Sequence, residues 1–453
     1  MFALCGPASL VCNSCLCTSC FNCVSKVSGQ SEHRSRILGY LFIFGLYYGL
    51  GILIMYTFGN TFMGWFEKWI TCPNFGKESC FGASLLLRVS LSLLIFYAFM
   101  VIMMLPKDDF SYGANKTCWI FKYLFPLVPI VAFFFVSNDF FSGYAIFCIY
   151  GGLVYLIFQD LAFNEFFLRF SNSFLLKTND SWCYTGLYAI FTLACHGLSF
   201  LFVALNFTYN FNCKSDKAIV IIGLVIIAIN IIITFFKTRN DVNLCSTGMY
   251  NAYISYYFYS SVSADMDAGC TTLTSSSGWV LGEIFINLLL VITVFLMMTY
   301  GRHFPVFSIE KPSDGDLKPE FFSNPELRNT SVTHEANALK GDEDAMDHLE
   351  YRTMKYVWLF LCFCFLSMHF LSISTNFGTV NIYKAEPWVM YSAQAGYYIK
   401  MINAFFASLL YLWILLAPVI LRNRTFGYSD NQQTGSTGTI AADPMRPAPL
   451  SAK

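Results

Sequence analysis

The chain of 453 residues contains little charge. Asp, Glu, Lys and Arg make up 12% of the residues, about half the share in a typical soluble domain, and there are six histidines. This composition argues against a soluble globular protein. The formal net charge is zero, so any charge asymmetry has to be sought between segments rather than in the total.

Familiar catalytic and nucleotide-binding motifs are also missing. The sequence has no Walker loop, no dinucleotide-binding glycine pattern, no nucleophile elbow and no HExxH helix. No polar segment is long enough to hold an ATPase domain. We therefore predict a protein that is not an enzyme, with no cofactor and no metal, and the sequence argues against transport driven directly by ATP.

The chain instead has ten stretches of about 20 mostly apolar residues, each long enough to cross a bilayer. Hydrophobic residues make up 56% of the chain, aromatic residues 18%, and the mean hydropathy is +0.53. Backbone polar groups in hydrocarbon must be satisfied within the segment, so solid apolar blocks predict helices rather than a β-barrel. The predicted fold is an all-α polytopic membrane protein with spans at 37–58, 83–105, 118–136, 143–170, 182–208, 218–236, 242–263, 278–300, 356–375 and 397–421.

Three of these spans are unusual. Span 118–136 contains Pro126 and Pro129, which remove backbone donors and should kink it. Span 242–263 is rich in hydroxyl groups and tyrosines, which indicates a helix packed inside the bundle. Span 143–170 would be about 42 Å long as a continuous helix, more than the roughly 30 Å hydrocarbon core, so it should be tilted or protrude.

The distribution of Lys and Arg predicts the orientation. With the N-terminus inside, 21 of the 28 basic residues fall in inside segments, and the bias remains when the long loop is left out. Both termini are therefore predicted to be cytosolic, whereas the sequence leaves open whether the membrane is an endomembrane or the plasma membrane. The predicted organisation is a Cys-rich cytosolic N-terminus at 1–36, eight spans within 37–300, an acidic disordered cytosolic loop at 301–355, two spans within 356–421 and a cytosolic tail at 422–453.

The 17 cysteines divide by this topology. Cys72, Cys80, Cys213 and Cys270 fall in loops on the oxidising side, where Cys72–Cys80 and Cys213–Cys270 disulfides are predicted; four free thiols are the alternative. Six further cysteines crowd the N-terminus, where lipid anchoring or membrane packing is favoured over a zinc site because no histidine lies among them. They are Cys5, Cys12, Cys15, Cys17, Cys20 and Cys23.

Ionisable groups within spans are costly and tend to be functional or paired. Asp160 and Asn164 are four residues apart on one face of span 143–170 and could frame a polar site. Lys122 lies at a similar depth, so a buried pair with Asp160 is predicted. Glu283 lies too far inside its span to reach the membrane surface. A purely structural pairing is the alternative for each of these groups.

Other polar residues in the spans have simpler interpretations. Arg88 and Lys400 lie near the outer ends of their spans, from where their side chains could reach the interface. His196 and His369 are single histidines in apolar spans and are predicted to be satisfied core residues.

An ordered set of segments along the chain resembles the serine incorporator family of multi-pass membrane proteins. The Cys-rich start, LLRVSLSLLIFYAFMVIMMLPKDD, KTCWIFKYLFPL, GGLVYLIFQDLAFNE, STGMYNAYISYYFYSS and LLYLWILLAPVILRNRTF occur in the family's order. Two family residues differ: a histidine is replaced by Phe163 and a tryptophan by Tyr256. The family's acid also falls seven residues after the Asp160 position, whereas Glu165 follows by five. The resemblance implies ten transmembrane helices in two bundles crossed by a long tilted fourth helix, and a role in membrane lipid handling.

The resemblance and the polar residues together suggest three functions. The first is passive lipid scrambling along a polar groove at the fourth helix, with headgroups engaged by Asp160, Asn164, Lys122, Tyr250, Tyr253, Tyr256 and Glu283 as candidates. The second is a scaffold that delivers serine to phosphatidylserine and sphingolipid synthesis, and the third is an ion or solute transporter. The expected partners are phospholipids, with serine, lipid-synthesising enzymes or a second copy of the chain as further candidates and no nucleic acid.

Overall fold

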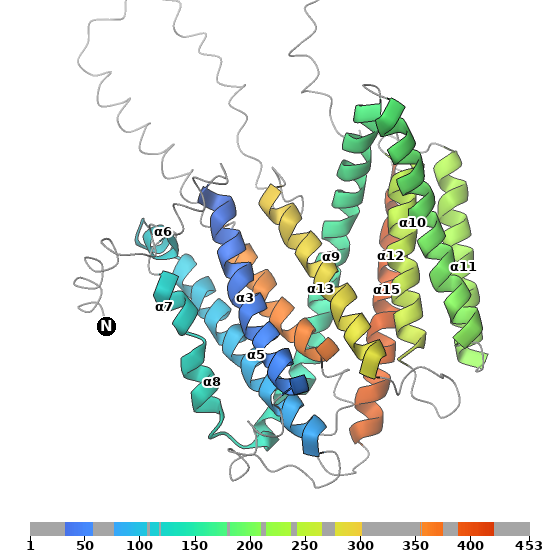
Figure 1. The fold of residues 1–453 in the computed structure, drawn as a ribbon. Coiled ribbons are helices and arrows are strands. Elements are labelled where there is room, and N and C mark those ends of the chain that lie inside the picture. Colours follow the sequence, from blue (N-terminus) through green and yellow to red (C-terminus); the bar gives the residue numbers. More distant parts are fainter. Residues whose placement is uncertain are drawn as a thin grey trace, which may run out of the picture.

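The computed structural model is all-helical in the residues that it describes, which are 32–57, 77–106, 109–116, 119–178, 182–209, 214–236, 242–264, 277–300, 354, 356–374 and 388–420. The helices are α3 (Glu32–Thr57), α5 (Lys77–Met104), α6 (Asp109–Lys116), α7 (Trp119–Leu124), α8 (Leu127–Phe133), α9 (Asn138–Thr178), α10 (Trp182–Tyr209), α11 (Lys214–Phe235), α12 (Leu244–Val262), α13 (Ser277–Tyr300), an unlabelled helix Tyr356–Ser374, and α15 (Trp388–Ile420). Figure 1 shows their arrangement.

Seven of these helices are long and apolar enough to cross a membrane, so the protein is an integral multi-pass membrane protein. Their apolar parts are Ser35–Ile54, Gly82–Met104, Gly143–Thr178, Trp182–Tyr209, Asp216–Phe235, Tyr356–Ser374 and Ala395–Ala417. Shorter apolar helices lie at Trp119–Phe133 and Gly282–Phe295. The fold class predicted from the sequence is confirmed, whereas the count of ten crossings stays a prediction.

The proline-containing span is broken, as predicted. α7 ends at Leu124 and α8 begins at Leu127, with Pro126 between them. The Arg88 side chain of α5 is fully buried and donates hydrogen bonds to the carbonyls of Phe133 (3.0 Å) and Val136 (3.1 Å) at the end of α8. A cation stabilises the carbonyl end of a helix, so Arg88 is a structural group. The prediction that its side chain reaches the membrane interface is therefore wrong.

The apolar side chains form two core clusters. The first core joins α3, α5, α7, α8 and the helix Tyr356–Ser374, and the second core joins α11, α12 and α15. Helix α9 belongs to both, because its buried residues up to Tyr155 line the first core and those from Leu156 onwards line the second. In Figure 1, α9 runs through the molecule between the two groups of helices.

Helix α9 is longer than predicted, with 41 residues instead of 28. A straight helix of this length measures about 60 Å, twice the hydrocarbon thickness. Two glycines mark its crossing with the helix Tyr356–Ser374: a Cβ on Gly151 would overlap Met368 Sδ, and one on Gly152 would lie 3.3 Å from His369 Cα. A larger residue at either position would require Met368 or the neighbouring backbone to shift.

Several predictions concern residues that lie outside the described parts of the structure. The N-terminal cysteines, the loop at 301–353 and the tail at 421–453 lie outside the described residues. Cys72, Cys213 and Cys270 also lie outside them, as does the side chain of Cys80, so neither predicted disulfide is tested.

Candidate functional site

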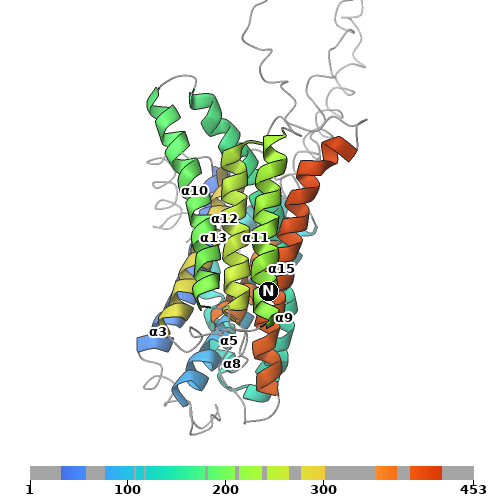
Figure 2. The same cartoon turned by 90° about the vertical axis from the view of Figure 1, so that its right-hand side faces the viewer.

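Helix α12 carries most of the buried polar side chains in the second core. All residues from Cys245 to Val262 are buried, as the sequence predicted for this hydroxyl-rich span. The helix packs against α9, α10, α11 and α15, and the last three stand together with it in Figure 2. Asn243 begins the helix with a capping box, in which its side chain accepts from the Ser246 backbone N–H at 3.0 Å and the Ser246 hydroxyl accepts from the Asn243 N–H at 3.2 Å.

A hydrogen-bonded network joins α9 to α12 at Asp160. The Tyr253 hydroxyl donates to Asp160 Oδ1 at 2.6 Å. Gln159 Nε2 donates to the hydroxyls of Tyr253 (3.2 Å) and Tyr257 (2.9 Å). The carboxyl group is fully buried, so this network is sealed from the surroundings in the present arrangement.

Several polar atoms of this network have no partner. Among the described residues, Asp160 Oδ2, Gln159 Oε1, Asn164 Oδ1 and the Tyr250 hydroxyl accept or donate no hydrogen bond, although each is buried. The Tyr250 ring stacks on Tyr411 of α15, with ring centroids 4.2 Å apart. The predicted neighbours Asp160, Asn164, Tyr250 and Tyr253 therefore lie in one region between α9 and α12, and the network leaves hydrogen-bonding capacity unused.

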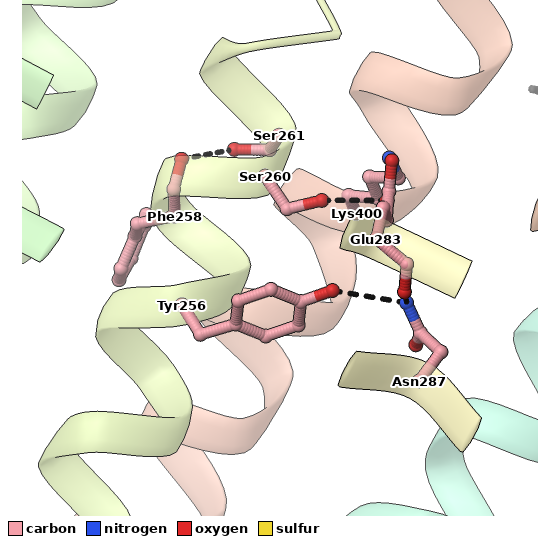
Figure 3. Close-up of polar contacts among 7 residues, drawn as sticks. All are labelled: Tyr256, Phe258, Ser260, Ser261, Glu283, Asn287 and Lys400. Atoms are coloured by element: carbon pink, nitrogen blue, oxygen red, sulfur yellow. Dashed lines mark hydrogen bonds and ion pairs between the residues drawn. The ribbon is translucent and has the colours of Figure 1, made fainter. Parts of the chain in front are cut away.

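A second polar cluster lies near the other end of α12 (Figure 3). Glu283 of α13 forms a buried ion pair with Lys400 of α15 and accepts from the Ser260 hydroxyl at 2.8 Å. Asn287 donates to the Tyr256 hydroxyl at 2.9 Å. These contacts tie α13 and α15 to α12, and they place Tyr256 and Glu283 away from Asp160.

Lys400 was missed as a partner of Glu283 because its position near a span end suggested an interfacial side chain. It is instead 3% exposed. The available signal was the occurrence of opposite charges at similar depth in two spans, 278–300 and 397–421. Depth can be read from the sequence, but the side of the helix that faces a neighbour cannot.

The predicted pair of Lys122 with Asp160 is wrong. Lys122 lies beside the first core, where its ammonium group donates to the Asn115 carbonyl at 2.6 Å and lies 4.5 Å from the centre of the Trp119 ring. Asp160 lies in the second core and bonds to Tyr253. Lys122 belongs to α7, beside the first core, whereas Asp160 belongs to the part of α9 that lines the second core.

The two histidines differ from each other. His196 Nε2 lies 3.1 Å from the Leu244 carbonyl oxygen, so it is satisfied as predicted. His369 is buried and stacks on Tyr155 with ring centroids 4.9 Å apart, but neither ring nitrogen has a hydrogen-bond partner among the described residues. The described part of the chain also contains no group of three His, Cys, Asp or Glu side chains arranged to hold a metal ion.

Known proteins that resemble this chain come from one family. The sequence model of the Serine incorporator (Serinc) family matches residues 9–424. Serine incorporator 2 of Bos taurus is 24% identical over 470 aligned positions, which cover 94% of this chain and 100% of that protein. Serine incorporator 2 of Homo sapiens is 23% identical over 338 positions, with 68% of this chain and 71% of that protein covered. The family match spans most of the residues that form both cores, so this membrane protein belongs to the serine incorporator family.

Proposed function

We propose that the protein moves phospholipids passively between the two leaflets of its membrane. The observation that supports this proposal is the set of buried polar side chains on α12, from Thr247 to Ser260, which hydrogen-bond to several neighbouring helices. Polar groups are costly in a membrane interior and are usually retained there for a function. Those that face α9, Tyr253 and Tyr257, lie one turn apart and offer contacts to a headgroup at successive positions, and no ATPase motif occurs in the sequence.

The path is closed in the present arrangement, because Asp160 and Tyr250 are fully buried and Tyr253 is 5% exposed. Transport therefore requires α9 to move away from α12, which breaks the hydrogen bonds of Gln159 and Asp160 to the α12 tyrosines. A headgroup entering the gap would replace these bonds. The outer faces of α10 and α11 expose large apolar side chains that suit lipid tails, such as Leu193 and Ile232.

The same proposal includes a particular architecture. Ten helices cross the membrane in two bundles, which correspond to the two core clusters, and α9 is the tilted helix that crosses between them. Both termini lie in the cytosol. The presence of α9 residues in both cores supports this arrangement. Movement of one bundle against the other would change the contact between α9 and α12, which is the contact that has to open for transport.

The test is dithionite quenching of fluorescent phosphatidylserine and phosphatidylcholine in liposomes containing the purified protein. Quenching well beyond the protein-free half, for both lipids and without ATP, is expected. Asp160→Ala should slow transfer about ten- to a hundredfold, because it removes a contact to the charged headgroup worth about 1.5–3 kcal/mol.

Glu165→Ala is the matched control on the same helix, since Glu165 forms its ion pair with Arg169 of α9 itself and not with α12. Its transfer rate should equal that of the original protein. Quenching that stops at half in vesicles shown to contain folded protein would refute scrambling. An unchanged rate in Asp160→Ala at equal reconstitution would remove only Asp160 from the mechanism.

Serine delivery to lipid-synthesising enzymes is the second candidate. It is favoured by the name of the relatives, Serine incorporator 2, and by the unpartnered acceptors around Asp160, which could receive the ammonium group of an amino acid. Binding of radiolabelled serine to the purified protein tests it. Saturable binding that is lost in Asp160→Asn is expected from this function, and no binding at millimolar serine would argue against it.

A further inference from the structure

The region around Asp160 is rich in acceptors and poor in donors. One carboxyl oxygen and two amide oxygens accept no hydrogen bond from the described residues. They are Asp160 Oδ2, Gln159 Oε1 and Asn164 Oδ1, and the Tyr250 hydroxyl is also without a partner there. Asp160 and Tyr250 are fully buried, Gln159 is 1% exposed and Asn164 is 5% exposed. An unsatisfied buried polar group costs about 1–3 kcal/mol, so four of them on two helices that pack together, α9 and α12, call for a ligand.

These oxygens belong to residues that the fold holds together. Asp160 and Asn164 are one turn apart on the same face of α9. Tyr253 connects to both Asp160 and Gln159 through hydrogen bonds, and the Tyr250 ring lies one turn away on α12, 6.0 Å from the Tyr253 ring.

The Tyr253 hydroxyl favours one orientation of the Gln159 amide. The amide nitrogen donates to the hydroxyls of Tyr253 and Tyr257. Turning the amide would place its oxygen beside the Tyr253 hydroxyl, whose proton already goes to Asp160, so that hydrogen bond would be lost. The Tyr253 hydroxyl donates its proton to Asp160 Oδ1, so it cannot also donate a hydrogen bond to Asp160 Oδ2.

The carboxylate also has no cation partner within the described residues. Lys400 pairs with Glu283, and Arg169 pairs with Glu165. An unpaired carboxylate in a low-dielectric interior is strongly destabilising, so Asp160 is either protonated or charged with a cation beside it. A proton supplies one donor, whereas three side-chain oxygens of the site have no partner within the described residues.

We propose that this site binds one monovalent metal cation, Na⁺ or K⁺, between α9 and α12. Its ligands are Asp160 Oδ2, Asn164 Oδ1, Gln159 Oε1 and the Tyr250 hydroxyl oxygen. Carboxylate and carbonyl oxygens replace the hydration shell of such ions, and one carboxylate balances one charge. Mg²⁺ or Ca²⁺ would leave a buried excess charge, because the site contains one carboxylate.

The bound ion holds the closed arrangement, because its ligands come from both helices. Separation of α9 from α12 would release it and free Asp160 for other contacts. The site does not depend on lipid transport, and ion binding can be measured on the closed protein without any lipid assay.

The experiment is thermal unfolding of the purified full chain in detergent, in chloride salts of Na⁺, K⁺ or N-methylglucamine at equal ionic strength. We expect Na⁺ or K⁺ to raise the Tm by about 3 °C or more, with saturation as the cation replaces N-methylglucamine. Equal Tm values in the three salts would overturn the site. A rise with serine but not with either metal cation would also overturn it, since the ligand would then be an ammonium group.

Two substitutions localise the effect. Tyr250→Phe removes one ligand and should weaken the apparent cation affinity several-fold, while Asp160→Asn should abolish the cation-dependent shift. Glu165→Gln, on the same helix but paired with Arg169, should keep it. Should Asp160→Asn fail to fold, Tyr250→Phe still decides the matter, because an unchanged affinity in that variant would exclude the proposed ligand set.

Discussion

At the residue scale, the buried charges separate into those that the fold neutralises and one that it does not. Arg88 donates to helix-end carbonyls, and Lys122 lies over the Trp119 ring and donates to a carbonyl. Glu283 and Lys400 neutralise each other. Asp160 keeps an oxygen without a partner among the described residues, which is why it carries both proposals while the others are structural.

The Glu283–Lys400 pair gives a prediction about stability. Lys400→Met should destabilise the protein by about 3–5 kcal/mol, because it leaves the Glu283 carboxylate buried with the Ser260 hydroxyl but without a cation. The double variant Glu283→Leu with Lys400→Met should recover most of that loss, since no uncompensated charge remains. Thermal unfolding in detergent measures both.

Glu165→Gln serves as the control, because the Glu165–Arg169 pair is partly exposed and such pairs contribute about 0–1 kcal/mol. Equal losses in the single and the double variant would contradict the coupling of the two charges. A loss in Lys400→Met no larger than that of the control would show that the carboxylate is not held in a dry interior.

The outcome for individual residues shows what a sequence can predict about charges in a membrane. Composition identifies which residues are costly, and position in a span gives their approximate depth. Partner choice depends on the direction in which each helix face points, which no single sequence contains. Lys122 and Asp160 therefore appeared to be partners and are not, while Glu283 and Lys400 were not paired and are.

At the element scale, the apolar runs predict where helices exist but not where they end. The hydropathy signal reports only the part of a helix that lies in hydrocarbon. Helix α9 continues through Ser171, Asn172 and Ser173 to Thr178, beyond the predicted end at 170. The kink of the 118–136 span was predictable because proline acts on the backbone directly, and the burial of α12 followed from its polar composition.

The crossing of α9 with the helix Tyr356–Ser374 gives a prediction at this scale. Gly151→Ala should destabilise the protein by about 1–3 kcal/mol, because the new methyl group would overlap Met368 Sδ and lie 3.2 Å from Met368 Cβ. Gly143→Ala on the same helix is the control, since nothing lies within 4 Å of a Cβ there. It should be neutral or stabilise by up to about 1 kcal/mol.

Met368→Ala provides a further check by making room for the methyl group. Combined with Gly151→Ala, it should cost less than the sum of the two single substitutions, as measured by unfolding in detergent. Additive losses would place the strain somewhere other than this contact. Equal effects of the two glycine substitutions would mean that α9 and the helix Tyr356–Ser374 do not depend on a close approach.

At the scale of the whole molecule, the two cores share α9 and also α13, whose Ile284 and Phe295 line the first core while Val294 lines the second. A helix common to two cores transmits displacement from one to the other, which suits the proposed lipid transport, because its path has to open. The family resemblance reached this architecture from ordered segments along the chain. Physical reasoning from composition alone reached the membrane class and the unusual length of α9.

The number of crossings decides the topology of the whole chain. Ten crossings place both termini on one side of the membrane, as the excess of Lys and Arg in alternate loops predicts, whereas seven crossings would place them on opposite sides. We expect tags at both ends to be digested together when protease is added to sealed vesicles whose cytosolic face is outward, and an epitope inserted in the loop 301–355 to be digested with them. An epitope inserted at 210–213, between α10 and α11, is the control and should survive until detergent opens the vesicles. Protection of one terminus alone would require an odd number of crossings, so one or all three of α7–α8, α12 and α13 would then have to be buried without spanning, and the two-bundle arrangement would need revision.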